Sequence, residues 1–166
     1  MNKTAKTILI AVLAVVLIGG GIAVGMNWNN WFGQDKPAAA EVDDTAEDWT
    51  GNKDTYTGKK NTDTIDIPGF DAMNLKANAT EQSVNLYNPE QNTCYMKMTL
   101  LLSDGTKLWE SKLIEPGKAV YDLTLAQPLS AGEYKDATLK YECYKMDEEQ
   151  TPLNGSDIKL TINVME

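Results

Sequence analysis

Beyond Thr64 the sequence breaks into short runs in which apolar and polar residues alternate, and turn signals separate one run from the next. These signals are Pro68-Gly69, Pro89, Asp104-Gly105, Pro116-Gly117 and Gly132. They recur about every 8–12 residues, which is the spacing typical of a sandwich or barrel. No helical period competes with the alternation in this region. The pattern predicts an all-β fold, an antiparallel β-sandwich over residues 63–166.

The turn at Asp104-Gly105 predicts how two of these runs pair. A two-residue type I′ hairpin would place Leu100 opposite Trp109 and Thr99 opposite Glu110. One face of the pair would then carry a core stripe of Cys94, Met96, Met98, Leu100, Trp109 and Leu113. In the run ATLKYECY the same alternation turns Leu139, Tyr141 and Cys143 inward.

The only two cysteines of the chain, Cys94 and Cys143, are both expected to point into the core. Outside the cytoplasm, two inward cysteines on separate strands are candidates for one disulfide. Closing so long a loop would stabilise the domain by about 4 kcal/mol on the chain-entropy model. The alternative is two buried free thiols that pack as small hydrophobic groups. We favour the disulfide between Cys94 and Cys143.

An uncharged apolar run, TILIAVLAVVLIGGGIAVG, occupies residues 7–25. It is long enough to cross a hydrocarbon core of about 30 Å as a helix. Lys3 and Lys6 precede it and the next basic residue is Lys36, so residues 1–6 are expected in the cytoplasm and the rest outside. A cleaved secretory signal is the alternative, but its apolar core is usually only about 7–15 residues long. We predict an uncleaved anchor over residues 7–26 and a single-pass protein of the cell membrane.

Residues 27–62 are expected to link this anchor to the folded domain. Trp28, Trp31 and Phe32 stand directly behind the apolar run, where amphipathic rings favour the headgroup layer, and we predict that they mark the membrane interface. The segment that follows is acidic at first and polar throughout. Such a composition buries too little apolar surface to offset the entropy of ordering. The sequence therefore predicts a flexible acidic stalk.

Composition argues against several classes of function. The net charge is −9, with 15 basic residues against 24 acidic ones, and nucleic-acid binding depends on basic residues that neutralise phosphates. The chain contains no histidine, which removes Ser-His-Asp and Cys-His catalysis. Two cysteines alone cannot build a thiolate zinc cage. We predict no cofactor, no metal site and no catalytic residue.

Two resemblances add to this interpretation. Cys94, Trp109 and the run DATLKYEC, in which Tyr141 stands two residues before Cys143, resemble the immunoglobulin pattern of Cys, core Trp and Tyr-x-Cys. The phrases IDIPGF, NLYNPEQN, LIEPGKAV, PLSAGEY and LNGSDIKL resemble an uncharacterised group of single-span surface proteins of Gram-positive bacteria. These resemblances imply an Ig-like extracellular domain on a membrane anchor, and they bring no catalytic residues with them.

The function expected from these features is a membrane-tethered extracytoplasmic interaction module of a bacterial surface or envelope assembly. Its partner would be a protein or a cell-wall glycan, and the domain by itself is expected to be monomeric. Contacts are expected in two loops marked by Pro89 and Pro152. The candidate contact residues are Asn88, Glu90, Asn92, Asp147, Glu148 and Asn154.

Two alternatives remain open from the sequence. The first is a carbohydrate-binding sandwich, in which exposed rings stack on sugar faces; the candidates are Tyr87, Tyr95, Tyr121 and Tyr144. The second is a carboxylate-based wall hydrolase, for which the acidic candidates are Glu142, Asp147, Glu148 and Glu149. The hydrolase is disfavoured because acidic clusters at loops usually carry solvated charge.

Overall fold

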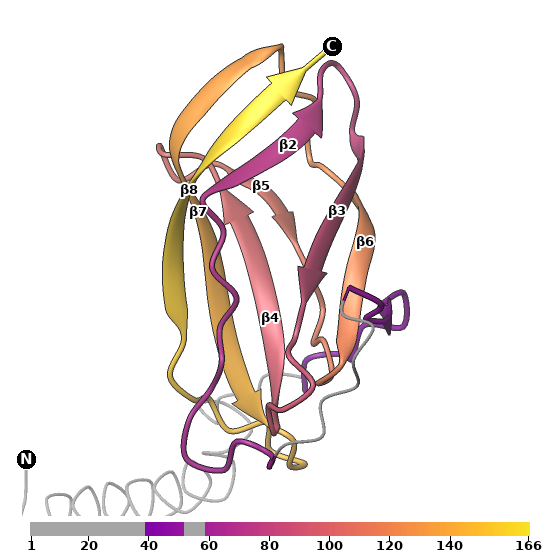
Figure 1. Ribbon diagram of the computed structural model, residues 1–166, viewed down its shortest axis with the longest axis vertical. Helices are drawn as coiled ribbons and strands as arrows, with labels where there is room; N and C mark the ends of the chain where they lie inside the picture. Colours follow the sequence, from indigo (N-terminus) through magenta and orange to yellow (C-terminus); the bar gives the residue numbers. More distant parts are fainter. Residues whose placement is uncertain (1–38, 52–58) are drawn as a thin grey trace, which may run out of the picture. The chain divides into compact units, whose positions relative to one another are not determined.

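Figure 1 shows the computed structural model, which describes residues 39–51 and 59–166. The strands of this part of the chain are β1 (Glu47–Asp48), β2 (Ala72–Lys76), β3 (Glu81–Tyr87), β4 (Cys94–Leu101), β5 (Lys107–Glu110), β6 (Lys118–Thr124), β7 (Gly132–Lys145) and β8 (Ser156–Met165). They form a three-stranded sheet in the order β1-β6-β3 and a five-stranded sheet in the order β2-β8-β7-β4-β5. The predicted all-β class is confirmed for these residues.

The described residues contain no helix that is long and apolar enough to cross a membrane. The predicted anchor over residues 7–26 lies outside them. The same holds for Trp28, Trp31 and Phe32, so the predictions made for these residues stay predictions.

The five-stranded sheet is built around β7, which pairs antiparallel with β4 on one side and with β8 on the other. At the sheet's edge, β2 pairs with β8 in the parallel direction, with Met73 opposite Ile162 and Leu75 opposite Val164. The sequence predicted a purely antiparallel sandwich, and this one pair departs from it. A short turn predicts that the runs on either side of it pair antiparallel. β2 and β8 lie near the two ends of the domain sequence, so no local signal predicts their parallel pairing.

The predicted inward faces of β4 and β7 are confirmed by burial, whereas in β5 it is Leu108 that is 0% exposed. Met96, Met98, Leu100 and Leu113 are 0% exposed, and the predicted inward residues of β7 are almost as deeply buried. Trp109 is half-buried and packs against the same cluster. Side chains from the three-stranded sheet, among them Leu86, Val120 and Leu123, join this cluster, so the two sheets share one hydrophobic core.

The β4–β5 hairpin has the predicted pairs but a different turn. Leu100 lies opposite Trp109 and Thr99 opposite Glu110, as expected. The turn is wider than a two-residue type I′ turn, because the Leu102 amide bonds the Thr106 carbonyl and Gly105 adopts a left-handed φ of 86°. An irregularity between Leu100 and Leu101 then restores the register that the shorter turn would have given.

Residues 39–51 are not a free stalk. We call them the strap. They belong to the same compact unit as the two sheets. Two of their residues form β1, with Glu47 opposite Ala119 and Asp48 opposite Lys118 at the edge of β6. The prediction of a disordered stalk over all of residues 27–62, with the domain beginning at residue 63, is therefore wrong for residues 39–51.

The strap contacts both sheets, because it also pairs with the segment that joins β5 to β6. Val42 bridges Leu113 in the parallel direction, and the adjacent Ile114 pairs with Met96 of β4. The Leu113 amide donates to the Glu41 carbonyl at 2.9 Å, and the Asp43 amide donates to the Leu113 carbonyl at 2.8 Å. The strap therefore contacts residues beside β4 of the five-stranded sheet and the edge of β6 in the three-stranded sheet. Figure 1 shows it beside the lower end of β6.

Candidate interaction site

The two loops predicted to make contacts lie at the same end of the domain. Residues 88–92 precede β4 and residues 147–154 follow β7, and the register places Cys94 opposite Lys145. Figure 1 shows this end below the label of β4. Residues 60–67 lie at the same end, since the Thr93 hydroxyl donates to the Asn61 carbonyl at 2.7 Å.

Asn88 and Asn92 do not face a partner, because they lie in the interior at 0% and 2% exposure. The amide nitrogen of Asn88 donates to the carbonyls of Cys94 and Ile114, both at 2.9 Å. The amide nitrogen of Asn92 donates to Asn88 Oδ1 at 3.0 Å and to the Asp66 carbonyl at 2.9 Å. The two side chains therefore stabilise the conformation of the loop. Pro89, which the sequence predicted to mark an exposed turn, is buried as well.

The other predicted contact residues remain at the surface. Glu90 is half-buried, and its backbone carbonyl accepts a hydrogen bond from the Lys60 ammonium. Glu148 and Asn154 are exposed. Asp147 is exposed too, but its carboxylate accepts from the Thr151 amide at 3.2 Å and therefore shapes its own loop.

An open groove of about 600 Å³ lies at this end between residues 62–67 and residues 153–156. The lining residues are Thr62, Asp63, Thr64, Ile65, Ile67, Thr93, Cys94, Leu153, Asn154, Gly155 and Ser156. Half-buried Ile65, Ile67 and Leu153 give it an apolar floor, and hydroxyl, amide and carboxylate groups form the rim. Of the predicted contact residues, Asn154 is the one that lines the groove. We call this site the end groove.

Sequence reasoning missed the floor of the end groove. The alternation of Ile65 and Ile67 with polar residues indicates a strand near the start of the domain and says nothing of a groove. Ile65 and Ile67 lie near the start of the domain sequence and Leu153 lies near its end. No local pattern predicts that they line one groove. Gly155 also matters here, because a Cβ atom on it would lie 2.1 Å from the Tyr141 carbonyl oxygen. Only a glycine lets this loop approach β7 so closely.

A second open groove, of about 450 Å³, lies on the other side of Leu153, Gly155 and Ser156 and is lined by Tyr144, Glu142, Lys140 and Asp157. Tyr144 stands directly opposite Tyr95 on the neighbouring strand, and both are half-buried on the face turned away from the core. The next pair along this face is Lys97 with Glu142. Two aromatic rings beside charged groups thus occupy the outer face of the five-stranded sheet.

The other two tyrosines proposed to stack on sugars are covered by the strap. The ring of Tyr87 stacks against Trp49, with centroids 4.0 Å apart. The Tyr121 hydroxyl accepts from the Thr50 amide at 2.8 Å. Trp49 also donates from Nε1 to Asn85 Oδ1 at 3.2 Å. All four candidate tyrosines are half-buried, and Tyr95 and Tyr144 are the two that none of these strap contacts engages.

Cys94 and Cys143 are both buried free thiols in the structure, so the predicted disulfide is not formed. The register supplies the reason, because Cys143 lies opposite Met96 and Cys94 opposite Lys145, which makes the cysteines diagonal neighbours within one sheet. Diagonal positions are typically about 7–8 Å apart, beyond the usual Cα separation of a disulfide. The two thiols share a hydrogen bond instead, which raises the pKa of Cys143 and lowers that of Cys94, while burial raises both.

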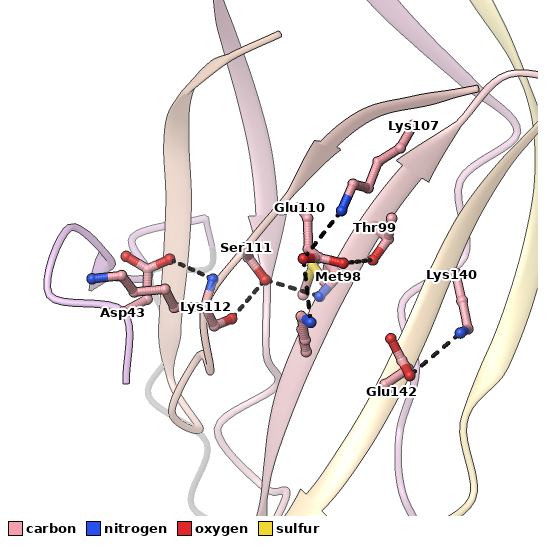
Figure 2. Close-up of polar contacts among 10 residues, drawn as sticks. Asp43, Met98, Thr99, Lys107, Glu110, Ser111, Lys112, Lys140 and Glu142 are labelled. Carbon is pink, nitrogen blue, oxygen red and sulfur yellow. Dashed lines mark hydrogen bonds and ion pairs between the residues drawn. The ribbon is translucent and has the colours of Figure 1, made fainter. Parts of the chain in front are cut away.

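Two carboxylates of the outer face, Glu110 and Glu142, are engaged in ion pairs (Figure 2). Glu142, the leading hydrolase candidate, pairs with Lys140 at 3.3 Å. Glu110 contacts Lys97 at 3.3 Å and Lys107 at 3.4 Å. Partial burial opposes ionisation of Glu110, but the two ammonium groups together outweigh it and lower its pKa. Within residues 39–51 and 59–166, no group of three or more acidic or thiol side chains is placed to hold a metal ion.

Comparisons with known proteins were made for the whole chain. No protein-family model matches it. No curated protein matches it either. A function is therefore proposed from the sequence, the fold and the two grooves.

Proposed function

We propose that this protein is a membrane-tethered, extracytoplasmic interaction module of a bacterial surface or envelope assembly, with an Ig-like β-sandwich as its folded part. The uncharged run over residues 7–25 supports the tether. The all-β domain with one shared core supports a rigid carrier of surface loops. The proposal places the contact at the end groove and holds that the module acts by binding and not by catalysis.

The observation that carries the proposal is the composition of the end groove. Its apolar floor of Ile65, Ile67 and Leu153 is bordered by uncharged groups such as Thr93 and Asn154. Binding sites commonly combine an apolar surface with a few polar groups that fix the orientation of the partner. The wall formed by residues 62–67 is braced by the buried Asn92, whose side chain bonds both the amide and the carbonyl of Asp66, which favours a site that is preformed on this side.

Photo-crosslinking in native membranes tests this function. The full chain carries a photoreactive amino acid at Asn154 in one variant and at Asp104 in a control variant. Asp104 is exposed in the turn that follows β4, at the opposite end of that strand. A discrete adduct from position 154 that is absent from position 104 is the expected result. Equal adducts from both positions, or none from position 154, would reject contact through the end groove.

A second candidate function, binding of cell-wall glycans, is favoured by the Tyr95–Tyr144 pair. Sugar rings stack on aromatic faces, and the charged groups of Lys97 and Glu142 on the next pair could bond sugar hydroxyls. The groove of about 450 Å³ beside Tyr144 gives room for such a ligand.

Retention on insoluble peptidoglycan tests the glycan hypothesis. Tyr144→Ala is expected to reduce retention of the detergent-solubilised full chain, whereas Tyr134→Ala, on the same strand beyond its bulge, serves as the control. If both variants bind as well as the unaltered chain, or if the unaltered chain is not retained, glycan binding through this face is excluded. Digestion of the glycan by the purified chain, lost on Glu142→Gln, would instead support the hydrolase.

A further inference from the structure

The edge of β6 is covered by a short and largely polar segment. β1 has only two residues, Glu47 and Asp48. The remaining strap contacts are isolated hydrogen bonds, ion pairs and one aromatic stack, that of Trp49 on Tyr87. Lys112 bonds Glu41 at 3.1 Å and Lys118 bonds Asp48 at 2.7 Å, but the acidic partners are 78% and 87% exposed. Exposed pairs of this kind contribute little to stability. The strap is therefore among the parts of the domain that open most readily.

Opening of the strap would uncover a specific set of groups. The carbonyls of Leu113 and Gly117 would lose the amides of Asp43 and Trp49. The ring of Tyr87 and the hydroxyl of Tyr121 would be released at the same time. An edge with unpaired backbone groups is a ready template for an extended chain. The ammonium groups of Lys112 and Lys118 would favour an extended chain with acidic side chains.

We propose that this edge is an exchange site for the strap of a second copy of the same chain. A strap supplied in trans would present the same acidic residues to Lys112 and Lys118, and the same indole to Tyr87. Every contact of the closed form is therefore available to the exchanged dimer without any new complementary surface. Exchange of an identical element between copies is a low-cost route to a dimer. This inference is independent of the proposed contact at the end groove.

Two matched cysteine variants test the exchange. Asp48 and Lys118 lie directly opposite each other in the pairing of β1 with β6. The neighbouring Trp49 amide donates to the Gly117 carbonyl, which makes 48 and 118 a pair without backbone hydrogen bonds between them. Cα atoms of such pairs are about 4.5 Å apart, within reach of a disulfide. The full chain is prepared in detergent as Asp48→Cys, as Lys118→Cys and as the double variant.

Mixing the two single variants under mild oxidation is expected to give a covalent dimer of twice the chain mass. The double variant alone is expected to close mainly within one chain, which verifies the register. The control mixture pairs Asp48→Cys with Glu81→Cys, because Glu81 is exposed and lies opposite Thr124 at the other end of β6. Free thiols are blocked with an alkylating reagent before denaturation so that the buried native cysteines do not contribute.

Each outcome of the crosslinking either supports the exchange or overturns it. A dimer from 48 with 118, and not from 48 with 81, supports the exchange. Closure of the double variant within one chain, without a dimer in the mixture, shows that the strap serves only its own domain and overturns the proposal. Equal dimer in both mixtures indicates random collision and overturns it as well. Failure of the double variant to close would contradict the register on which the inference rests.

Discussion

The indole of Trp49 lies flat against the ring of Tyr87, with 4.0 Å between the ring centroids and 8° between the planes. This stack joins the acidic segment before the domain to β3 of the three-stranded sheet. It gives that segment an anchor of substantial area, since its other side chains are mainly small or charged. Residues 39–51 are thus part of the fold, although their composition is typical of a linker.

The first prediction concerns this stack. Trp49→Ala should loosen the strap, because an aromatic pair contributes about 0.5–1.5 kcal/mol beyond its buried area. At 1.4 kcal/mol per factor of ten, the Asp43 amide, which bonds the Leu113 carbonyl, should exchange with solvent about two- to tenfold faster. Trp49→Phe keeps a ring for stacking and should change the exchange much less. Unaltered exchange in Trp49→Ala would show that the strap is held without the stack.

The second prediction concerns pH. A hydrogen bond from Lys118, with its charge, lowers the pKa of Asp48 in the folded chain. A lowered carboxyl pKa contributes stability above the unfolded pKa of about 3.9, and this contribution is lost as pH falls through the folded value. Strap opening, measured by Trp49 fluorescence, should therefore increase below about pH 3.9. Asp48→Asn should already show a looser strap at neutral pH and lack this component of the acid response. Identical acid profiles for both chains would contradict the assignment.

The third prediction concerns the buried amide network. Asn88→Ala removes the donor to the Cys94 and Ile114 carbonyls and the acceptor for Asn92. Leaving such buried groups unsatisfied should lower the free energy of unfolding by about 1–3 kcal/mol. The control is Asn154→Ala, an exposed position that should stay within about 0.5 kcal/mol. Urea denaturation of both variants measures the difference, and equal stabilities would rule out a structural role for Asn88.

The fourth prediction concerns the thiols. Cys94 and Cys143 are free and buried, so unfolding without reductant should expose two reactive thiols per chain. In the folded chain both should react slowly, and the pKa of Cys143 is raised further by its hydrogen bond to Cys94. Addition of a reductant should leave the melting temperature unchanged. A chain that shows no thiol after unfolding would instead carry the disulfide expected from its sequence.

The fifth prediction concerns Gly155. An added Cβ atom would meet the Tyr141 carbonyl oxygen at 2.1 Å, so Gly155→Ala must push the loop away from β7. Overpacking of this kind costs about 1–3 kcal/mol of stability. Gly69→Ala is the matched control, because nothing lies within 4 Å of its Cβ position. If thermal denaturation shows the same small effect for both variants, the close approach of the loop is not required.

Local patterns were sufficient to predict the strands and their buried faces. Period-two alternation identified the inward residues of β4 and β7, because each side of a strand meets a different environment. The Asp104-Gly105 turn gave the Leu100–Trp109 pair, although the turn itself is wider than predicted. The candidate loops were found at turn residues, and Asn154 does line the end groove.

Other features depend on contacts between distant parts of the chain. The sequence by itself determined an all-β domain with inward-facing cysteines, because side-chain alternation is a local property. Only the tertiary structure decided that those cysteines are diagonal and stay free, since their separation follows from the register of two strands about fifty residues apart. It also decided that Asn88 and Asn92 turn inward, because their partners include Asp66 and Ile114, which are distant from them in the sequence. The strap is ordered for the same reason. Its acidic residues meet Lys112 and Lys118 and its Trp49 meets Tyr87, and no local pattern places these partners beside them.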